Sequence, residues 1–364
     1  MTLSTESDVN KFLESIELPG IGRTIAEVGR IIGAKASAGA VQAQIELGFP
    51  AHSRIDDYRA HIAAAISAET GSDDINIVLS TKIVAHGVQR NLKPLGNVRN
   101  IIAIASGKGG VGKSTVAVNV ALALAAEGAS VGLLDADIYG PSQPHMVGLA
   151  GKQPQSEDGK TMRPLVAHGL QVMSIGFLID PDQPMVWRGP MVTSALQQLL
   201  HQTTWQDLDY LIVDMPPGTG DIQLTLSQQV PVSGAVIVTT PQNIATLDAR
   251  KGLAMFRKVS VPVLGVIENM STHVCSECGH EEPIFGAGGG EQMAGDFDVE
   301  LLGQLPLDAR IREQTDSGEP TVLADPDSVA ATAYRNAALR MAAAQAAQGR
   351  DYASKFPKIV IEES

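Results

Sequence analysis

A glycine-rich segment near residue 110 has the residue types and spacing of a phosphate-binding loop. It reads Ser106-Gly107-Lys108-Gly109-Gly110-Val111-Gly112-Lys113-Ser114-Thr115 and contains the pattern G-x-x-x-x-G-K-S between Gly107 and Ser114. Glycines allow the backbone to bend around a phosphate and to point N–H groups at its oxygens. The Lys113 ammonium would neutralise the β- and γ-phosphates, and the Ser114 hydroxyl would bind Mg²⁺. The segment therefore predicts a binding site for a nucleoside triphosphate.

Carboxylates follow two apolar segments further along the chain. Leu133-Leu134-Asp135-Ala136-Asp137 ends one segment, and Tyr210-Leu211-Ile212-Val213-Asp214 ends the other. Open α/β sheets bind ligands at the carboxyl ends of their strands. A carboxylate directly after a buried strand is the Walker B pattern, which binds Mg²⁺ directly or through water, and we assign Asp214 to it. An aspartate at a strand end can also cap the following helix.

The chain contains two cysteines, Cys275 and Cys278, in a C-x-x-C arrangement. A turn of this kind brings two thiolates close enough for one metal or cluster, but two ligands are half a site. Two chains would together supply four thiolates, which suit a [4Fe–4S] cluster and equally a Zn²⁺ ion. His273 and His280 flank the pair, so a cramped Cys₂His₂ zinc site within one chain is a second option. A redox dithiol is a third, although no thioredoxin-like βαβ context surrounds it.

These candidate residues need a scaffold, and the chain from residue 101 onward predicts one. Short aliphatic segments, typical of strands buried on both faces of a parallel sheet, alternate with helical segments of about ten residues or more. This alternation predicts a doubly wound, mostly parallel sheet with helices on both faces. The expected strands are Ile101–Ala105, Val131–Asp135, Tyr210–Asp214, Ala235–Thr239 and Pro262–Ile267, and the expected helices are Thr115–Glu127, Val192–Leu200, Asp221–Gln229, Thr246–Val259 and Asp327–Gln348.

Residues 1–92 differ in texture and predict a small α+β module. We expect residues 93–100 to form a linker, residues 101–348 to form the ATPase domain, and residues 349–364 to form a tail. Within the module, helices are expected over Asp8–Ile16, Ile21–Ile32 and Ile55–Glu69, and strands over Val41–Leu47 and Ile75–Thr81.

Composition excludes several classes of protein. The 364 residues suggest two domains, and 44% hydrophobic with 18% charged residues is typical of a globular chain. The net charge of −13 argues against general binding to nucleic acid or to anionic membranes. Val116–Ala126 is too short for a membrane span, and the first residues lack the apolar core of a signal peptide. We therefore expect a cytoplasmic protein with neither nucleic acid nor membrane as its partner.

Lys108, one residue after the first glycine, gives the loop the form K-G-G-x-G-K-[ST]. This form resembles the deviant loop of the MinD/ParA/nitrogenase-iron-protein class of ATPases. A fuller set of motifs resembles the Mrp/ApbC family of ATP-binding iron–sulfur cluster carriers over about residues 100–348. The motifs are the phosphate loop, DADIYGPSQP (Asp135–Pro144), DMPPGTGD (Asp214–Asp221), ENM (Glu268–Met270), CSECGH (Cys275–His280) and IFGAGGG (Ile284–Gly290).

The resemblance implies a homodimer that holds a labile [4Fe–4S] cluster between Cys275 and Cys278 of both chains. The cluster would pass to apo iron–sulfur proteins, with scaffold proteins as further partners, and ATP binding or slow hydrolysis would be coupled to cluster loading or release.

The same resemblance implies roles for residues around the nucleotide. Lys108 would reach the nucleotide of the other subunit, Asp135 would orient the attacking water, and Asp137 would lie in the first switch. Asn269 would contact adenine. The implied catalytic group is Lys108, Lys113, Asp135 and Asp214, and the implied nucleotide contacts are Gly107, Lys108, Gly109, Gly110, Val111, Gly112, Lys113, Ser114, Thr115, Asp137 and Asn269.

The N-terminal module resembles, weakly, the PaaD-like iron–sulfur assembly domain. Members of that family often have a cysteine near the turn that Phe49-Pro50-Ala51-His52 occupies here, and this chain has none there. We therefore interpret the module as a docking or regulatory domain.

Two rival functions use the same loop. One is an ATPase switch of the MinD/ParA type with a zinc-stabilised dimer and a membrane or DNA partner, which would favour a basic amphipathic C-terminal helix or a basic surface. The chain instead ends with Phe356-Pro357 and Glu362-Glu363-Ser364. The other rival is a kinase or synthetase, against which Lys108 and the lack of a recognisable acceptor pocket argue.

Overall fold

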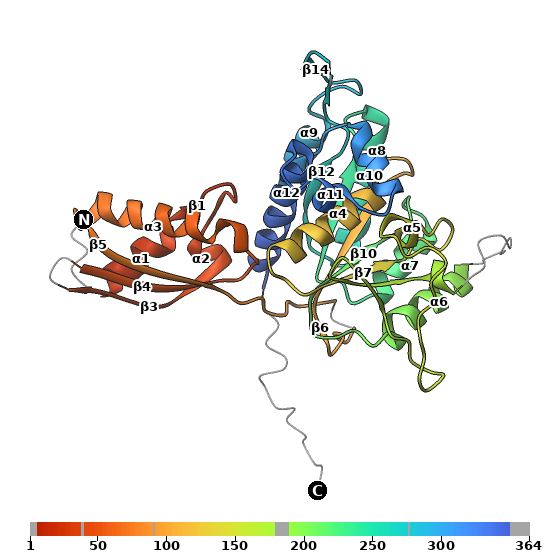
Figure 1. Cartoon of the computed structure of the whole chain (residues 1–364), viewed down its shortest axis with the longest axis horizontal. Helices are drawn as coiled ribbons and strands as arrows, with labels where there is room; N and C mark the ends of the chain where they lie inside the picture. Colours follow the sequence, from red (N-terminus) through yellow and green to blue (C-terminus); the bar gives the residue numbers. More distant parts are fainter. Residues whose placement is uncertain (1–5, 38–39, 90–91, 179–188, 276, 350–364) are drawn as a thin grey trace, which may run out of the picture.

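The computed structural model describes residues 6–37, 40–89, 92–178, 189–275 and 277–349. Two units of unequal size lie side by side (Figure 1). The smaller is built from the N-terminal residues around a three-stranded sheet, and the larger surrounds an eight-stranded sheet. The tail expected at residues 349–364 lies outside the described residues from position 350 onward. None of the described helices is long and apolar enough to cross a membrane.

The eight-stranded sheet is parallel except at one edge, where β8 pairs with β9 in the antiparallel direction. Its strand order is β15-β12-β11-β6-β10-β7-β9-β8. The predicted doubly wound, mostly parallel sheet is therefore confirmed, and each of the five expected strands is present. The strands are β6 (Val98–Ser106), β7 (Val131–Asp135), β8 (Leu165–Ala167), β9 (Leu170–Ser174), β10 (Leu208–Asp214), β11 (Gly234–Thr239), β12 (Val263–Glu268) and β15 (Leu301–Gln304).

Helices connect these strands and bury their apolar residues against the sheet. α4 and α12 pack against each other, and α8 and α9 pack together against β11 and β12. Every side chain of α4 from Val116 to Leu124 is buried, which explains why this stretch is apolar except at Asn119, whose Nδ2 donates to the Thr115 carbonyl at 2.9 Å. The helices are α4 (Lys113–Ala126), α5 (Gln143–Met146), α6 (Gly189–Gln202), α7 (Asp221–Gln229), α8 (Asn243–Lys258), α9 (Gly289–Asp296), α10 (Ala309–Asp316), α11 (Thr321–Ala324) and α12 (Val329–Ala346), with a 3₁₀ turn η2 (Ile175–Phe177).

The small module has an α+β fold, as predicted. β3 pairs with β4 in the antiparallel direction, and β4 pairs with β5 in the parallel direction. Val41, Ala43, Ile45 and Leu47 of β4 are buried, and the intervening residues are more exposed. The elements are α1 (Glu6–Ser15), β1 (Glu17–Leu18), β2 (Arg23–Thr24), α2 (Ile25–Val28), β3 (Gly29–Ser37), β4 (Ala40–Leu47), η1 (His52–Arg54), α3 (Ile55–Thr70) and β5 (Asp74–Thr81).

The helix predicted over Ile21–Ile32 is wrong except at Ile25–Val28. From Gly29 onward the backbone is extended and pairs with β4. A Cβ atom at Gly29 would lie 2.8 Å from the carbonyl oxygen of Glu46, so glycine permits the close approach of the two strands. Strand pairing with a distant segment therefore overrides the local helical spacing.

The connection between the units is not a free linker throughout. β6 begins at Val98, within the segment expected as a linker. Before it, His86 Nδ1 lies 2.8 Å from Asn100 Oδ1, and Asn100 Nδ2 donates to the Val84 carbonyl at 2.9 Å. The chain leading out of the module therefore packs on the start of the central strand.

Candidate functional site

The phosphate-binding loop joins the end of β6 to the start of α4, as its sequence context predicted. Gly110 and Gly112 have φ angles of +81° and +80°, a backbone conformation that residues other than glycine rarely adopt. Gly112 is the N-cap of α4, so the positive end of the helix dipole faces the loop. Lys108 is half-buried, and its carbonyl accepts a hydrogen bond from Ser106 Oγ at 2.9 Å. This geometry can bind a phosphate group.

Lys113, the first residue of α4, and Asp214, the last residue of β10, form a buried ion pair. The Lys113 ammonium donates to Asp214 Oδ1 and, at 3.1 Å, to Ser114 Oγ. The side chains are 6% and 0% exposed. Gln143 Nε2 donates to Asp214 Oδ2 at 2.9 Å and to the Ser114 carbonyl at 3.0 Å. The structure thus brings the two residues assigned to phosphate and metal chemistry into direct contact.

Asp135 lies beside this pair because β7 and β10 are neighbours in register, with Asp135 opposite Asp214. Its carboxylate accepts hydrogen bonds from the backbone N–H groups of Asp137 and Gln143 and from Ser174 Oγ, each at 3.1 Å. Burial, and then the negative charge of Asp214, raise the pKa of Asp135 to about 7. A carboxyl group with this pKa can exchange a proton near neutral pH.

Asp137 follows in the loop after β7 and is half-buried. Burial raises its pKa above the ordinary value, and the Lys113 charge opposes that shift. A cavity of about 500 Å³ lies between this loop and the loop after β10, lined in part by Asp137, Tyr139, Pro217 and Gln223. Asp137, which the resemblance places in the first switch, therefore faces the loop after β10 across one cavity.

The loop after β10 is held by Gln223, a residue of α7. Gln223 Oε1 accepts from the Gly220 N–H at 2.8 Å, and its Nε2 donates to the Pro216 and Pro217 carbonyls. The Gly218 N–H also donates to the Ser106 carbonyl, at 2.9 Å. The loop is therefore attached both to its own helix and to the residue that opens the phosphate loop.

Asn269 contacts the phosphate loop. Its Nδ2 donates to the Val111 carbonyl at 2.9 Å, and the side chain is almost fully buried. A Cβ atom at Gly112 would lie 2.3 Å from this nitrogen. The adenine contact that the resemblance implies for Asn269 stays a prediction, and the structure shows its contact with the phosphate loop.

Cys275 and Cys278 lie in a hairpin that projects beyond α9 (Figure 1). Its strands are β13 (His273–Val274) and β14 (Glu281–Glu282), which pair in the antiparallel direction. Cys275 is partly exposed and Cys278 is exposed. Backbone hydrogen bonds from Cys278 and Glu277, and then one from the Cys278 side chain, lower the pKa of the Cys275 thiol. Such a turn favours the thiolate form, which binds metals.

The two parts of the candidate site remain separate within one chain. The phosphate loop, Asp135, Asp137, Asp214 and Asn269 meet at the carboxyl ends of the strands, whereas the cysteines lie on the hairpin that follows β12. Among the described residues, no group of three or more His, Cys, Asp or Glu side chains is placed to hold a metal ion. His273 Nδ1 instead lies 3.0 Å from the Leu307 carbonyl. The described residues therefore do not assemble the Cys₂His₂ zinc site considered as an alternative.

Gln143 and Glu268 have site contacts that sequence reasoning did not assign. Gln143 lies within the DADIYGPSQP motif and Glu268 within the ENM motif, so the sequence marked both positions without indicating a role for either. Their contacts join segments far apart in sequence: Gln143 with Asp214, and Glu268 with Gly290. A motif match could have drawn attention to them, but only the fold supplies the partners.

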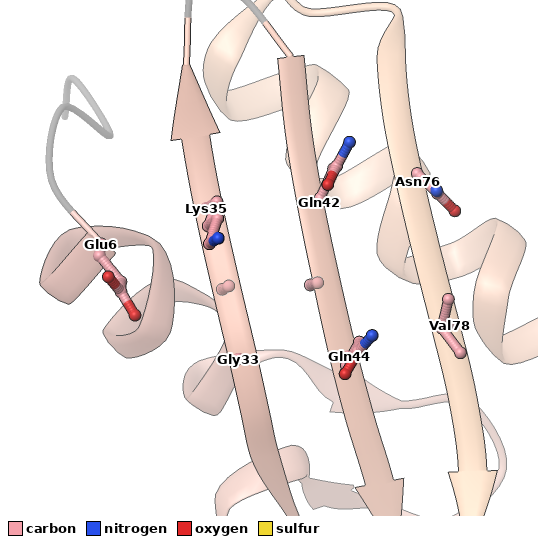
Figure 2. A pocket seen from close by; sticks show the side chains of 9 residues that line it. Glu6, Gly33, Lys35, Gln42, Gln44, Asn76 and Val78 are labelled. Carbon is pink, nitrogen blue, oxygen red and sulfur yellow. The ribbon is translucent and has the colours of Figure 1, made fainter.

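A second cavity lies on the small module, away from these residues. It has a volume of about 280 Å³ on the sheet formed by β3, β4 and β5. Figure 2 shows Lys35, Gln42, Gln44, Asn76 and Val78 on this sheet and Glu6 beside it. Amide and small side chains predominate, and the lining contains neither cysteine nor histidine. Thiolate or imidazole chemistry is therefore not expected at this cavity.

Two family models match the chain. The model described as NUBPL iron-transfer P-loop NTPase matches residues 97–342, and the model described as iron-sulfur cluster assembly protein matches residues 6–78. The iron-sulfur cluster carrier protein of Pseudomonas fragi is 59% identical over 76% of this chain and 96% of its own length. The carrier of Escherichia coli K12 is 54% identical over 82% of this chain and 81% of its own. The iron-sulfur cluster transfer protein NUBPL of Mus musculus is 54% identical over 70% of this chain and 80% of its own length.

Solved structures agree with the nucleotide-binding fold. A nucleotide-binding protein from Archaeoglobus fulgidus, in complex with ADP, is 37% identical with a TM-score of 0.55, over 61% of this chain and 87% of that protein. The cell division ATPase MinD of Pyrococcus furiosus is 22% identical with a TM-score of 0.50, over 66% of this chain and 98% of that protein. This likeness shows the fold alone.

Proposed function

Because this chain belongs to the Mrp/ApbC/NUBPL family of iron–sulfur cluster carriers, which combine a P-loop NTPase domain with an N-terminal assembly domain, we propose a specific mode of carriage. Two chains hold one [4Fe–4S] cluster between the four thiolates of their Cys275 and Cys278 pairs. The dimer binds ATP, and its slow hydrolysis is coupled to cluster loading or release. Apo iron–sulfur proteins receive the cluster, and scaffold proteins are further partners.

The exposed thiol pair at the tip of the hairpin is the observation that carries this proposal. Two thiolates complete half of the four-sulfur ligand set that iron–sulfur clusters use. A two-fold axis at the hairpin supplies the other half from identical residues. Exposure of Cys278 supports transfer, because an acceptor thiolate must reach the cluster before it can displace the first ligand.

At the nucleotide, the proposed roles follow from charge and position. Lys113 neutralises phosphate oxygens, and Lys108 serves the nucleotide of the partner chain. Ser114 and Asp214 present hard oxygen ligands that fit Mg²⁺, which proteins bind through few side chains together with substrate phosphates. When bound, Mg²⁺ would neutralise charge on the β- and γ-phosphates. Asp135 orients the attacking water and accepts its proton, as its pKa near neutrality supports.

The test is anaerobic reconstitution with iron and sulfide, with iron, sulfide and zinc quantified per dimer and the absorption spectrum recorded. We expect about four iron and four sulfide per dimer in the wild type. Cys275→Ala and Cys278→Ala should lose the cluster and retain ADP binding. Lys113→Ala is the matched control, because it should lose ADP binding and retain the thiols.

The possible results separate the two functions that the sequence left open. A full cluster in Cys278→Ala would contradict bridging by the two pairs. Zinc without iron, at one ion per dimer or per chain, would make the cysteines structural and favour a partner-binding ATPase switch. Transfer of the cluster to an apo-ferredoxin, followed by the recipient's absorption, then tests carriage itself.

A further inference from the structure

Glu268 is a buried carboxylate that neither the nucleotide chemistry nor the thiol chemistry uses. It is the last residue of β12, and its side chain is 0% exposed. Its Oε2 accepts from the Gly290 N–H at 2.6 Å, and its Oε1 accepts from Gln304 Nε2 at 3.0 Å. Gly290 lies in the first turn of α9, where the helix dipole stabilises a negative charge. Glu268 therefore joins the end of β12 to the start of α9 and to the end of β15.

Two glycines of the IFGAGGG motif allow α9 to come this close. A Cβ atom at Gly289 would lie 2.4 Å from the Pro241 carbonyl oxygen, and one at Gly290 would lie 2.8 Å from the Glu268 Cβ. Side chains at these positions would push the helix away from the strand end. The last two glycines of the motif are thus explained by packing against Pro241 and Glu268.

The next residue, Asn269, faces the phosphate loop. Its side chain donates to the Val111 carbonyl at 2.9 Å, and its backbone N–H donates to the Thr239 carbonyl at 2.8 Å. Two consecutive residues at one strand end therefore contact the nucleotide loop and the helix α9.

The segment that carries both thiols lies between these two contacts. It leaves the sheet after Asn269 and returns to Gly288, the N-cap of α9. On the outgoing side, the Ser271 N–H donates to the Leu305 carbonyl, and the Leu307 N–H donates to the Thr272 carbonyl, each at 2.9 Å. Leu305 directly follows Gln304, which Glu268 binds. Glu268 therefore fixes the C-terminal end of the thiol segment directly, through Gly290, and its N-terminal end indirectly, through Gln304 of β15.

We propose that Glu268 is a positioning residue that transmits the state of the phosphate loop to the cysteine hairpin, with Asn269 as its contact to the loop. A displacement of Val111 moves Asn269, and Glu268 carries the displacement to α9 and to both ends of residues 270–288. The inference rests on the proposed cluster site for its functional meaning. Its first measurement needs no cluster, so the two can fail separately.

The first experiment is amide hydrogen exchange on the full-length protein with and without ADP. In the wild type, we expect ADP to slow exchange in peptides from residues 271–286 by about threefold or more. Glu268→Ala should lose this response and keep the Kd for ADP within about threefold. Glu268→Gln, which retains a carbonyl acceptor for Gly290, should restore the response. Glu282→Ala, at an exposed acidic position on the hairpin, is the control and should respond like the wild type.

Several outcomes would overturn the inference. One is a hairpin whose exchange ignores ADP in the wild type, and another is a Glu268→Ala protein that keeps the full response. If Glu268→Ala does not fold, Gln304→Ala serves instead. It removes one of the two hydrogen bonds that the Glu268 carboxylate accepts and should weaken the effect of ADP on hairpin exchange. A full response in Gln304→Ala would then contradict the role of Glu268.

The second experiment uses the reconstituted cluster and visible circular dichroism. Addition of a non-hydrolysable ATP analogue should change the wild-type spectrum and the rate of transfer to an apo-ferredoxin. Glu268→Ala should load iron to the wild-type level and show neither change. A wild type that loads no cluster would contradict the proposed function alone, because the exchange experiment would still decide the link.

Discussion

Lys113 and Asp214 carry opposite charges that are almost entirely removed from water. Removing two charges from water costs several kcal/mol per ion, and only close pairing with further hydrogen bonds offsets it. Gln143 and Ser114 supply those bonds here. The pair is therefore poor evidence for stability and better evidence for function, because the same two residues are those proposed above to bind phosphate and metal.

Asp135 leads to a prediction about pH. Its pKa is raised to about 7, first by burial and then by the charge of Asp214. The carboxylate that could accept a proton from water is the major form above pH 7 and is lost as the pH falls. We therefore expect the rate of ATP hydrolysis to be constant above about pH 8 and to fall about tenfold per pH unit well below 7. A phosphate-release assay between pH 5.5 and 8.5 measures this profile.

The control for this prediction is Asp135→Asn. The substitution should lower the rate by about 100-fold, and the residual rate should lose the dependence near pH 7. ADP affinity, measured over the same range, separates binding from hydrolysis. A flat wild-type profile, or an unchanged profile in Asp135→Asn, would show that another group controls the proton.

Single residues were predictable from sequence to an unequal degree. Lys113, Asp135 and Asp214 stand at recognisable distances from glycines or apolar segments, and the structure brings them together. Gln143 and Glu268 have no such local signal. Their hydrogen-bond partners lie 71 and 22 residues away in the sequence and are brought near only by the fold. Amide and carboxylate groups that brace a site have few local sequence signals.

At the scale of elements, the phosphate loop depends on how closely helix α8 approaches it. A Cβ atom at Gly107 would lie 2.1 Å from the Asp248 carbonyl carbon, whereas one at Gly109 would meet only Pro217 Cγ, at 4.0 Å. Gly107→Ala must therefore displace α8 or the loop, and we expect it to lower the free energy of unfolding by about 2 kcal/mol or more. Gly109→Ala should cost about 1 kcal/mol or less.

Urea unfolding of the two alanine variants, followed by far-ultraviolet circular dichroism, measures this difference. The comparison is matched, because both substitutions add one methyl group to the same loop, two residues apart. Equal losses in the two variants would show that loop flexibility, and not contact with α8, controls the effect.

Elements were predicted well where their own residues carry the signal. Buried aliphatic runs such as Val131–Asp135 indicated strands correctly, since both faces of a parallel strand are covered. Short elements failed: β15 has four residues, and β13 and β14 have two each. β15 forms by pairing with β12, and β13 and β14 pair with each other, so none of the three is specified by its own residues alone. The error at Ile21–Ile32 has the same origin, because β3 is specified by β4 and not by its own spacing.

At the scale of the whole molecule, the small module is attached to the C-terminal end of the phosphate-loop helix. Glu127, the C-cap of α4, is 3% exposed. Its carboxylate accepts from the Ser53 N–H at 2.8 Å and from Ser53 Oγ at 2.5 Å, and its carbonyl accepts from the His52 N–H at 3.3 Å. A carboxylate at this end of a helix opposes the dipole. Its position is explained by the donors that the module supplies.

Further polar contacts support the same attachment. Arg23 and Glu300 form an ion pair at 2.8 Å, and Arg340 Nε donates to the Gly20 carbonyl at 3.0 Å. The turn that holds Phe49 and Ala51, both fully buried, leads directly into this junction. The turn, which contains no cysteine in this chain, is thus used here for packing. Sequence alone left the module as a docking or regulatory domain, because contacts between units leave no periodic pattern.

This arrangement predicts that removing the Glu127 contact separates the units without unfolding either one. Glu127→Ala leaves the Ser53 donors without their acceptor and should weaken docking by about 1–3 kcal/mol. Limited proteolysis should then cleave the chain between residues 82 and 97 at least several times faster than in the wild type, while ADP affinity stays within about threefold.

The control is Glu14→Ala, at an exposed acidic position on α1, which should be cleaved at the wild-type rate. Cleavage that is unchanged in Glu127→Ala would mean that the remaining contacts hold the module alone. A large loss of ADP affinity would instead mean that the module helps to shape the phosphate loop through α4, since the helix that Glu127 ends is the one that Lys113 begins.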